Sequence, residues 1–138
     1  MANYFQKILI IDDDTVDRWI MKKSMNKVNF SKEIMEADNG ADGLKMITDH
    51  TNGNQLPELI FLDINMPVLD GFGFLDVFEQ LSRDYKKRCR IAVISSIESE
   101  QEKKRALKYE SVIGYFEKPL KEELLLQLMQ QSRFTQAC

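Results

Sequence analysis

The chain has 138 residues, a mass of 16.1 kDa, 43% apolar residues and a net charge of −3 at pH 7. This length predicts one domain with its own hydrophobic core, and the acidic balance argues against nucleic acid or a membrane as a partner. The sequence opens without a signal peptide and contains no membrane-spanning apolar run, and its cysteines, Cys89 and Cys138, have no motif spacing. We therefore expect reduced thiols in a cytoplasmic protein.

Short apolar runs alternate with amphipathic segments along the chain. In order, they predict strand Lys7–Ile11, helix Thr15–Lys27, strand Glu33–Ala37, a helix from the Asn39–Gly40 turn to about His50, strand Leu59–Asp63, helix Gly71–Leu81, strand Arg90–Ser95, a helix from Ser99 to about Tyr109, strand Ile113–Glu117 and helix Lys121–Gln131. The first helix is predicted from apolar residues at Val16, Trp19, Ile20, Met25 and Val28. We expect a basic loop at Arg83–Arg88 and a polar tail at 132–138. The single histidine, His50, excludes a Cys/His zinc cluster, and its place near a helix end is typical of a surface residue.

This alternation predicts an α/β fold. Five strands joined by helices form a parallel sheet with helices on both faces, because each crossover is right-handed and must cover the sheet. The expected arrangement is a doubly wound, flavodoxin-like sheet with strand order 2-1-3-4-5. The first and third strands are then neighbours, and ligands bind outside the carboxyl ends of the strands at that switch point.

Polar side chains stand where these strands end. Asp12 and Asp13 follow the first strand, Asp63 ends the third, Ser95 ends the fourth and Lys118 follows the fifth. Carboxylates this close cannot all stay ionised unless a cation joins them, and Mg²⁺ accepts such oxygen ligands together with a phosphate oxygen. A metal, a lysine and a hydroxyl around a carboxylate nucleophile predict a phosphoryl-transfer site.

These motifs resemble those of the receiver domain, the phosphoacceptor module of bacterial two-component response regulators. The resemblance covers about residues 5–131 and makes the whole chain, 1–138, one receiver of the single-domain type. It rests on Ile10-Ile11-Asp12-Asp13, Leu62-Asp63-Ile64-Asn65-Met66-Pro67 with the Asp70-Gly71 turn, Val93-Ile94-Ser95-Ser96, Tyr115 and Lys118-Pro119.

The resemblance implies a role for each matching residue. Asp63 would be phosphorylated in a phosphorelay, and Mg²⁺ would be held by Asp12, Asp13, Asp63 and the backbone carbonyl of Asn65. Ser95 and Lys118 would contact the phosphoryl group, the cis Lys118–Pro119 bond would aim the lysine, and Tyr115 would be the switch aromatic. The donor would be a histidine kinase or a histidine phosphotransfer protein. Such a phosphoprotein assists its own modification but is not a turnover enzyme.

We expect the signal to leave through the fourth helix, fifth strand and fifth helix, between Ser99 and Gln131. The stretch Glu100–Arg105 is wholly polar, and only Ala106 and Leu107 look able to anchor that helix, so its local stability should be low. The chain ends soon afterwards, which predicts altered binding to an unknown protein target rather than an attached effector domain.

Other interpretations compete with this one. The chain could be a receiver separated from a larger regulator or kinase, or an interaction module that is never phosphorylated. The run Asp12-Asp13-Asp14-Thr15-Val16 also resembles haloacid-dehalogenase-type phosphatases, with Asp12 as nucleophile and Asp14 as general acid. That family needs a late acidic pair at a strand end, whereas Glu122 and Glu123 fall in a predicted helix. The aspartates could also simply cap the first helix, and Tyr115 could be half-buried packing.

Overall fold

The computed structural model describes residues 4–49, 56–66, 69–81, 83–97 and 99–137. The predictions for His50, Pro67 and Cys138 lie outside these residues. The described strands are β1 (Phe5–Ile11), β2 (Ser31–Ala37), β3 (Leu59–Asp63), β4 (Arg90–Ser95) and β5 (Val112–Glu117). The described helices are α1 (Thr15–Lys27), α2 (Gly40–Thr48), α3 (Gly71–Glu79), α4 (Arg83–Arg88), α5 (Glu100–Leu107) and α6 (Glu122–Ala137).

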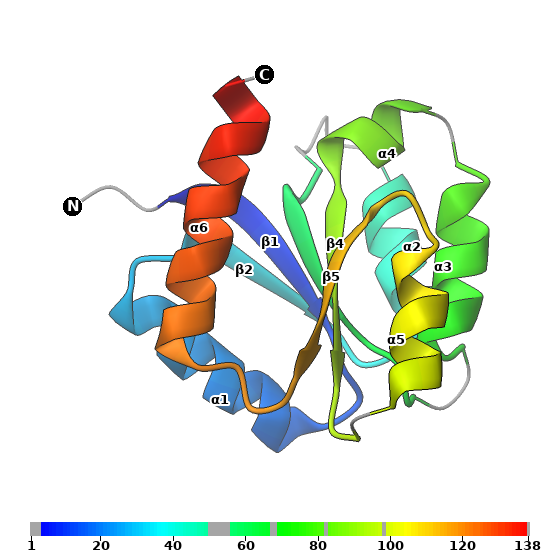
Figure 1. The fold of residues 1–138 in the computed structure, drawn as a ribbon, viewed down its shortest axis with the longest axis horizontal. Coiled ribbons are helices and arrows are strands. Elements are labelled where there is room, and N and C mark those ends of the chain that lie inside the picture. The colour runs from blue at the N-terminus through cyan, green and yellow to red at the C-terminus, as the bar shows by residue number, and fades with distance from the viewer. Residues whose placement is uncertain (1–3, 50–55, 67–68, 82, 98, 138) are drawn as a thin grey trace.

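The five strands form one parallel sheet with the order β2-β1-β3-β4-β5, which confirms the predicted fold (Figure 1). The central strand β3 lies between β1 and β4, with Ile10 opposite Phe61 on one side and Leu62 opposite Val93 on the other. All five residues of β3 are buried. A continuous apolar strand is stable only when both faces of the sheet are covered.

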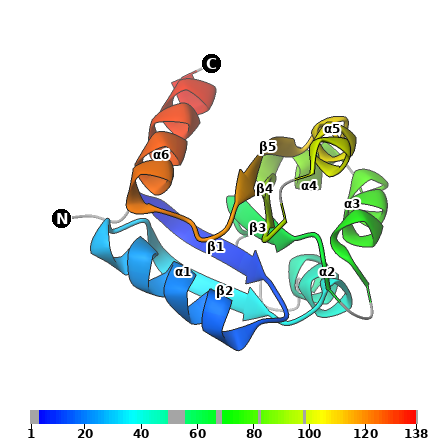
Figure 2. The same ribbon diagram turned by 60° about the horizontal axis from the view of Figure 1, so that its bottom comes forward.

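Helices cover both faces, with α1 and α6 on one and α2, α3 and α5 on the other (Figure 2). Successive strand residues point to opposite faces, so each strand contributes to two cores. On the α2/α3/α5 side, Leu9, Leu62 and Val93 pack with α2, α3 and α5 side chains. On the other side, the alternate residues Ile8, Ile10, Phe61 and Ile94 pack with α1 and α6, including Met21, Met25, Leu125 and Leu128.

The apolar residues that predict α1 do not all face the core. Met21 and Met25 are 3% and 0% exposed, whereas Val16 and Trp19 are 63% and 57% exposed. Methionines four residues apart lie on one face of a helix and fill the gap above the sheet. The apolar stripe of this helix is therefore split between the core and the surface.

Two segments differ from the predicted elements. Arg83–Arg88 is the short helix α4 rather than a loop, with Asp84 in its first turn and basic residues in its last, a distribution that suits the helix dipole. Helix α6 continues through Ala137, although its end was expected at Gln131 and a tail at 132–138. Neither glycine nor proline interrupts it, and extending a helix costs far less than starting one. No helix within the described ranges is long and apolar enough to cross a membrane.

Helix α5 is attached differently from the way the sequence predicts. Ser99 caps it by accepting a hydrogen bond from the Glu102 backbone N–H at 3.2 Å, as the capping signature indicates. Ala106 is buried, but Leu107 is 47% exposed and is not an anchor. The guanidinium of Arg105 lies 3.9 Å from the centre of the Phe72 ring on α3. The Ser99 cap and the Arg105 contact therefore add to the attachment that the buried Ala106 provides.

Candidate functional site

The sheet register brings the predicted side chains to one edge. Asp63 is the last residue of β3 and lies opposite Ile94, while Ser95, the last residue of β4, lies opposite Glu117. The Lys118 backbone N–H donates to the Ser95 carbonyl at 2.9 Å, which extends the β4–β5 pairing to the lysine. The ends of β1, β3, β4 and β5 thus open together, as parallel strands require.

Three carboxylates meet at this edge. One oxygen from each of Asp12, Asp13 and Asp63 lies within 4.8 Å of the others. Asp12 and Asp63 are 0% and 4% exposed, while Asp13 is exposed. Asp14 has a separate role, because its Oδ1 accepts from the backbone N–H groups of Val16 and Asp17 and caps α1. Capping therefore accounts for one aspartate of the run, and the other two join Asp63.

The ammonium of Lys118 is the positive charge of the site. Its Nζ lies 2.7 Å from Asp12 Oδ2 and 3.3 Å from Asp63 Oδ2. A third carboxylate, Asp17 on α1, lies 3.0 Å away. Burial of the ammonium lowers the pKa of Lys118, but the hydrogen bonds and charges of these carboxylates outweigh it and leave the pKa raised. The Lys118–Pro119 peptide bond is cis, as the resemblance implies.

The surroundings of Asp63 make its carboxyl group harder to ionise. Burial raises the pKa of Asp63 to about 6, with the Lys118 charge opposing the rise and the Asp12 charge adding to it. Its Oδ1 accepts a hydrogen bond from the Asn65 backbone N–H at 3.2 Å. A buried carboxyl with a raised pKa at a sheet edge is typical of a functional group.

The donor set fits a hard divalent cation. Asp12 Oδ2 is buried and, within the described part of the chain, makes only the ion pair with Lys118 and no aligned hydrogen bond. Three carboxyl groups stand beside a single ammonium, so their negative charge exceeds the positive charge next to them when they are ionised. Mg²⁺ prefers oxygen ligands and keeps several waters, so a half-open cluster such as this one suits it. Asp12, Asp13 and Asp63 are the side chains that would hold the ion.

Ser95 and Tyr115 meet at one carbonyl group. The Ser95 hydroxyl donates to the Ile97 carbonyl at 2.9 Å and accepts from the Ile97 backbone N–H at 3.1 Å. The Tyr115 hydroxyl also bonds the Ile97 carbonyl, at 3.1 Å, and reaches Glu102 Oε2 at 3.4 Å. Ser95 is therefore at the edge but bonded within its own loop, and Tyr115 is half-buried beside α5.

Two α1 residues that the sequence analysis missed also reach the site. Asp17 contacts Lys118, and Arg18 donates from Nη1 to the Asp12 backbone carbonyl and from Nε to Glu36 Oε1. Burial would raise the pKa of Glu36, but its hydrogen bonds with Lys22 and Arg18 lower it. An acid in the first turn of a helix is usually read as a partner of the helix dipole, so the sequence carried no signal for the contact with Lys118.

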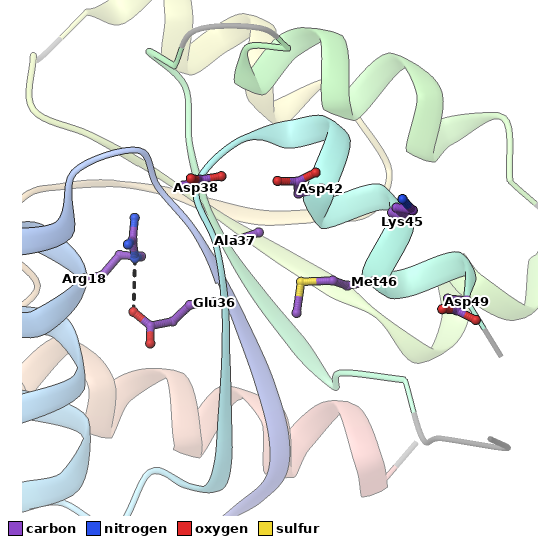
Figure 3. A pocket seen from close by; sticks show the side chains of 8 residues that line it. All are labelled: Arg18, Glu36, Ala37, Asp38, Asp42, Lys45, Met46 and Asp49. Carbon is purple, nitrogen blue, oxygen red and sulfur yellow. Dashed lines mark hydrogen bonds and ion pairs between the residues drawn. The ribbon is translucent and has the colours of Figure 1, made fainter. Parts of the chain in front are cut away.

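Arg18 and Glu36 also form one wall of a pocket of 530 Å³ (Figure 3). The opposite wall comes from α2 and includes Asp42 and Lys45, with Asp49 just past its end. None of the three clustered carboxylates lines this pocket. Lys118 instead lines a separate pocket of 150 Å³ together with Asp17, Ile20, Met21, Ser96, Pro119 and Leu120.

Comparison with known proteins is consistent with this geometry. The family model described as the response regulator receiver domain matches residues 8–130. The sensor histidine kinase CheAY of Helicobacter pylori is 30% identical over 125 residues, which are 91% of this chain but only 15% of that protein. Protein PilH of Pseudomonas aeruginosa is 27% identical over 87% of this chain and 91% of its own length.

The fold is shared with solved structures. A two-component response regulator from Cytophaga hutchinsonii superposes with a TM-score of 0.85 at 23% identity, covering 95% of this chain and 98% of the other. The chain spans 4% of a second matched protein, the hybrid signal transduction histidine kinase A of Dictyostelium discoideum. The activities of such whole proteins therefore belong to much longer chains.

Proposed function

The chain belongs to the response regulator receiver domain family, and from that membership we propose that Asp63 accepts a phosphoryl group from a histidine kinase or a histidine phosphotransfer protein. Receiver domains are signalling proteins and not turnover enzymes, and this holds for the chain. The observation that carries the proposal is the position of Asp63. It is the buried carboxylate that ends the central strand, 3.3 Å from an ammonium and within a cluster of two further aspartates.

In the transfer, an oxygen of Asp63 attacks the phosphorus of the phosphohistidine donor. The new P–O bond replaces the P–N bond, and the electron pair of that bond leaves with the imidazole. Asp12, Asp13, Asp63 and the Asn65 backbone carbonyl would hold Mg²⁺, which would supply positive charge to offset the charge of the phosphoryl oxygens. Lys118 already lies beside Asp63 and pairs with the transferred group.

The modified site then changes its contacts with the β4–α5 loop. The Ser95 hydroxyl leaves the Ile97 carbonyl for a phosphoryl oxygen, and Tyr115 moves with it. The bonds that would change are the two that now meet at Ile97. The expected result is a shift of the surface formed by α5, β5 and α6, which an unknown protein target reads.

The donor docks over α1, beside Lys118. Val16, Trp19 and Ile20 are 63%, 57% and 36% exposed on this helix. Ile20 also lines the pocket that contains Lys118, so the apolar patch borders the site. Exposed apolar side chains next to a functional group are typical of a partner surface.

The test is phosphorylation with a small donor. The protein is incubated with acetyl phosphate and Mg²⁺, and its intact mass and modified peptide are determined. We expect one phosphoryl group on Asp63, no labelling of Asp63→Asn or of protein treated with a chelator, and unchanged labelling of Asp84→Asn, which removes an equal charge on α4. Label on Asp12 would favour the phosphatase interpretation, and an unlabelled protein would favour the inert module.

A further inference from the structure

Asp17 shares the lysine of the site with the proposed phosphoacceptor. Its Oδ2 lies 3.0 Å from Lys118 Nζ, farther than Asp12 Oδ2 at 2.7 Å but nearer than Asp63 Oδ2 at 3.3 Å. The contact joins α1 to the loop between β5 and α6. An ammonium has three N–H donors, and in the described part of the chain Lys118 faces three carboxylates. Asp17 is not among the clustered carboxylates that could share a metal ion.

We propose that Asp17 is a positioning residue that draws the Lys118 ammonium toward α1 and limits its pairing with Asp63, the longest of its three ion pairs. The proposal rests on the proposed function and adds a residue to it. The Lys118 side chain is 11% exposed and that of Asp17 is 34% exposed, so the pair stands at the rim, where a molecule approaching the site meets it. The same two residues line the 150 Å³ pocket beside Ile20.

Removal of the Asp17 charge should weaken the binding of a cation to the site and strengthen the binding of an anion. Without Asp17, the ammonium moves closer to Asp63, one of the carboxylates that would hold Mg²⁺, and the site also loses one negative charge. Both changes weaken Mg²⁺ binding. A dianionic phosphodonor meets less repulsion at the rim of the site, so its apparent affinity rises once Mg²⁺ is saturating. A misfolded site would instead bind both Mg²⁺ and the phosphodonor more weakly.

The test compares Asp17→Asn with Asp17→Glu, which keeps the carboxylate, and with Glu123→Gln, which removes an equal charge on α6. Mg²⁺ affinity is measured by calorimetry, and the rate of phosphorylation is measured against acetyl phosphate concentration at saturating Mg²⁺. For Asp17→Asn we expect about threefold weaker Mg²⁺ binding and about threefold lower KM for acetyl phosphate, the size of one partly exposed ion pair. Asp17→Glu and Glu123→Gln should stay near the wild type.

A third measurement needs neither metal nor phosphodonor. Acetylation of Lys118 by a small reagent, followed by peptide mass spectrometry, should be faster in Asp17→Asn than in the wild type, with the exposed Lys103 as internal reference. If the wild type is not labelled at Asp63, the proposed function fails, and the Mg²⁺ and acetylation measurements still test Asp17. Equal Mg²⁺ affinity and equal Lys118 acetylation in Asp17→Asn and the wild type would overturn the role of Asp17, even in a protein that is phosphorylated on Asp63.

Discussion

Asp63→Asn should stabilise the metal-free protein at neutral pH, and the gain should depend on pH. Burial raises the pKa of Asp63 from 3.8 to about 6. Between pH 3.8 and about pH 6, the folded protein therefore keeps a proton on this carboxyl that the unfolded chain has lost. The free energy of unfolding consequently falls as pH rises through this range. Each unit of pKa difference corresponds to about 1.36 kcal/mol, which makes the full cost about 3 kcal/mol above pH 6.

Asparagine has a similar shape and does not titrate, so it avoids this cost. Below pH 3.8 both side chains are neutral, and the two proteins should have similar free energies of unfolding. The difference in free energy of unfolding between the two proteins should grow between pH 4 and pH 6 and level off at about 3 kcal/mol. Such a cost is expected for a functional residue that is kept at the expense of stability. The sign follows from the buried carboxylate and does not depend on the metal.

Urea unfolding in a chelating buffer, at intervals from pH 4 to pH 7.5, measures this difference. Asp84→Asn, which removes a charge on α4 away from the cluster, serves as the control and should not reproduce the pH-dependent gain. Adding Mg²⁺ at pH 7.5 should stabilise the wild type more than Asp63→Asn, because binding to the folded state alone raises its free energy of unfolding. A constant difference between the two proteins across the pH range, or one that narrows as pH rises, would refute the reasoning.

Further predictions concern packing and access. Gly71→Ala would place a Cβ 2.6 Å from a backbone atom of the β3–α3 loop, so it should destabilise the protein by about 1–3 kcal/mol in urea unfolding. Gly73→Ala should destabilise it less, because its Cβ would lie 2.6 Å from the movable end of the Leu69 side chain. Trp19→Ala should slow transfer from a phosphorylated histidine protein and leave labelling by acetyl phosphate unchanged, since the ring is 57% exposed; equal loss with both donors would contradict its role in docking. Cys89 is buried, and burial raises the pKa of its thiol to about 12. In a Cys138→Ala protein, a thiol reagent should therefore label Cys89 only after unfolding, and rapid labelling of the folded protein would contradict this.

Much of the site follows from the alternation of strands and helices. Once the sheet order is inferred, the residues after parallel strands must share an edge, and this places Asp12, Asp63, Ser95 and Lys118 together. The chemistry then depends on residue types that can be read directly. The sequence therefore predicts the carboxylate cluster and its lysine without any knowledge of side-chain packing.

Features set by packing could not be predicted in this way. On α1, Met25 and Trp19 both fit an apolar helical pattern, but only the methionine faces the sheet, because the tilt of the helix decides which side is covered. Asp17 faces Lys118 for the same reason. The Ser95 hydroxyl bonds the Ile97 carbonyl, and this partner is set by the conformation of the loop rather than by residue order.

The attachments of α5 explain how a small change at the site could reach the surface. The Ser95 and Tyr115 hydroxyls share the Ile97 carbonyl, so a serine that turns toward a modified Asp63 gives up a contact that the tyrosine also uses. The other contacts of α5 include the Arg105–Phe72 contact and the Ser99 cap. A cation–π contact and a hydrogen bond each contribute only about 1 kcal/mol to stability. We therefore expect phosphorylation of Asp63 to shift α5, while the strands buried on both faces stay in place.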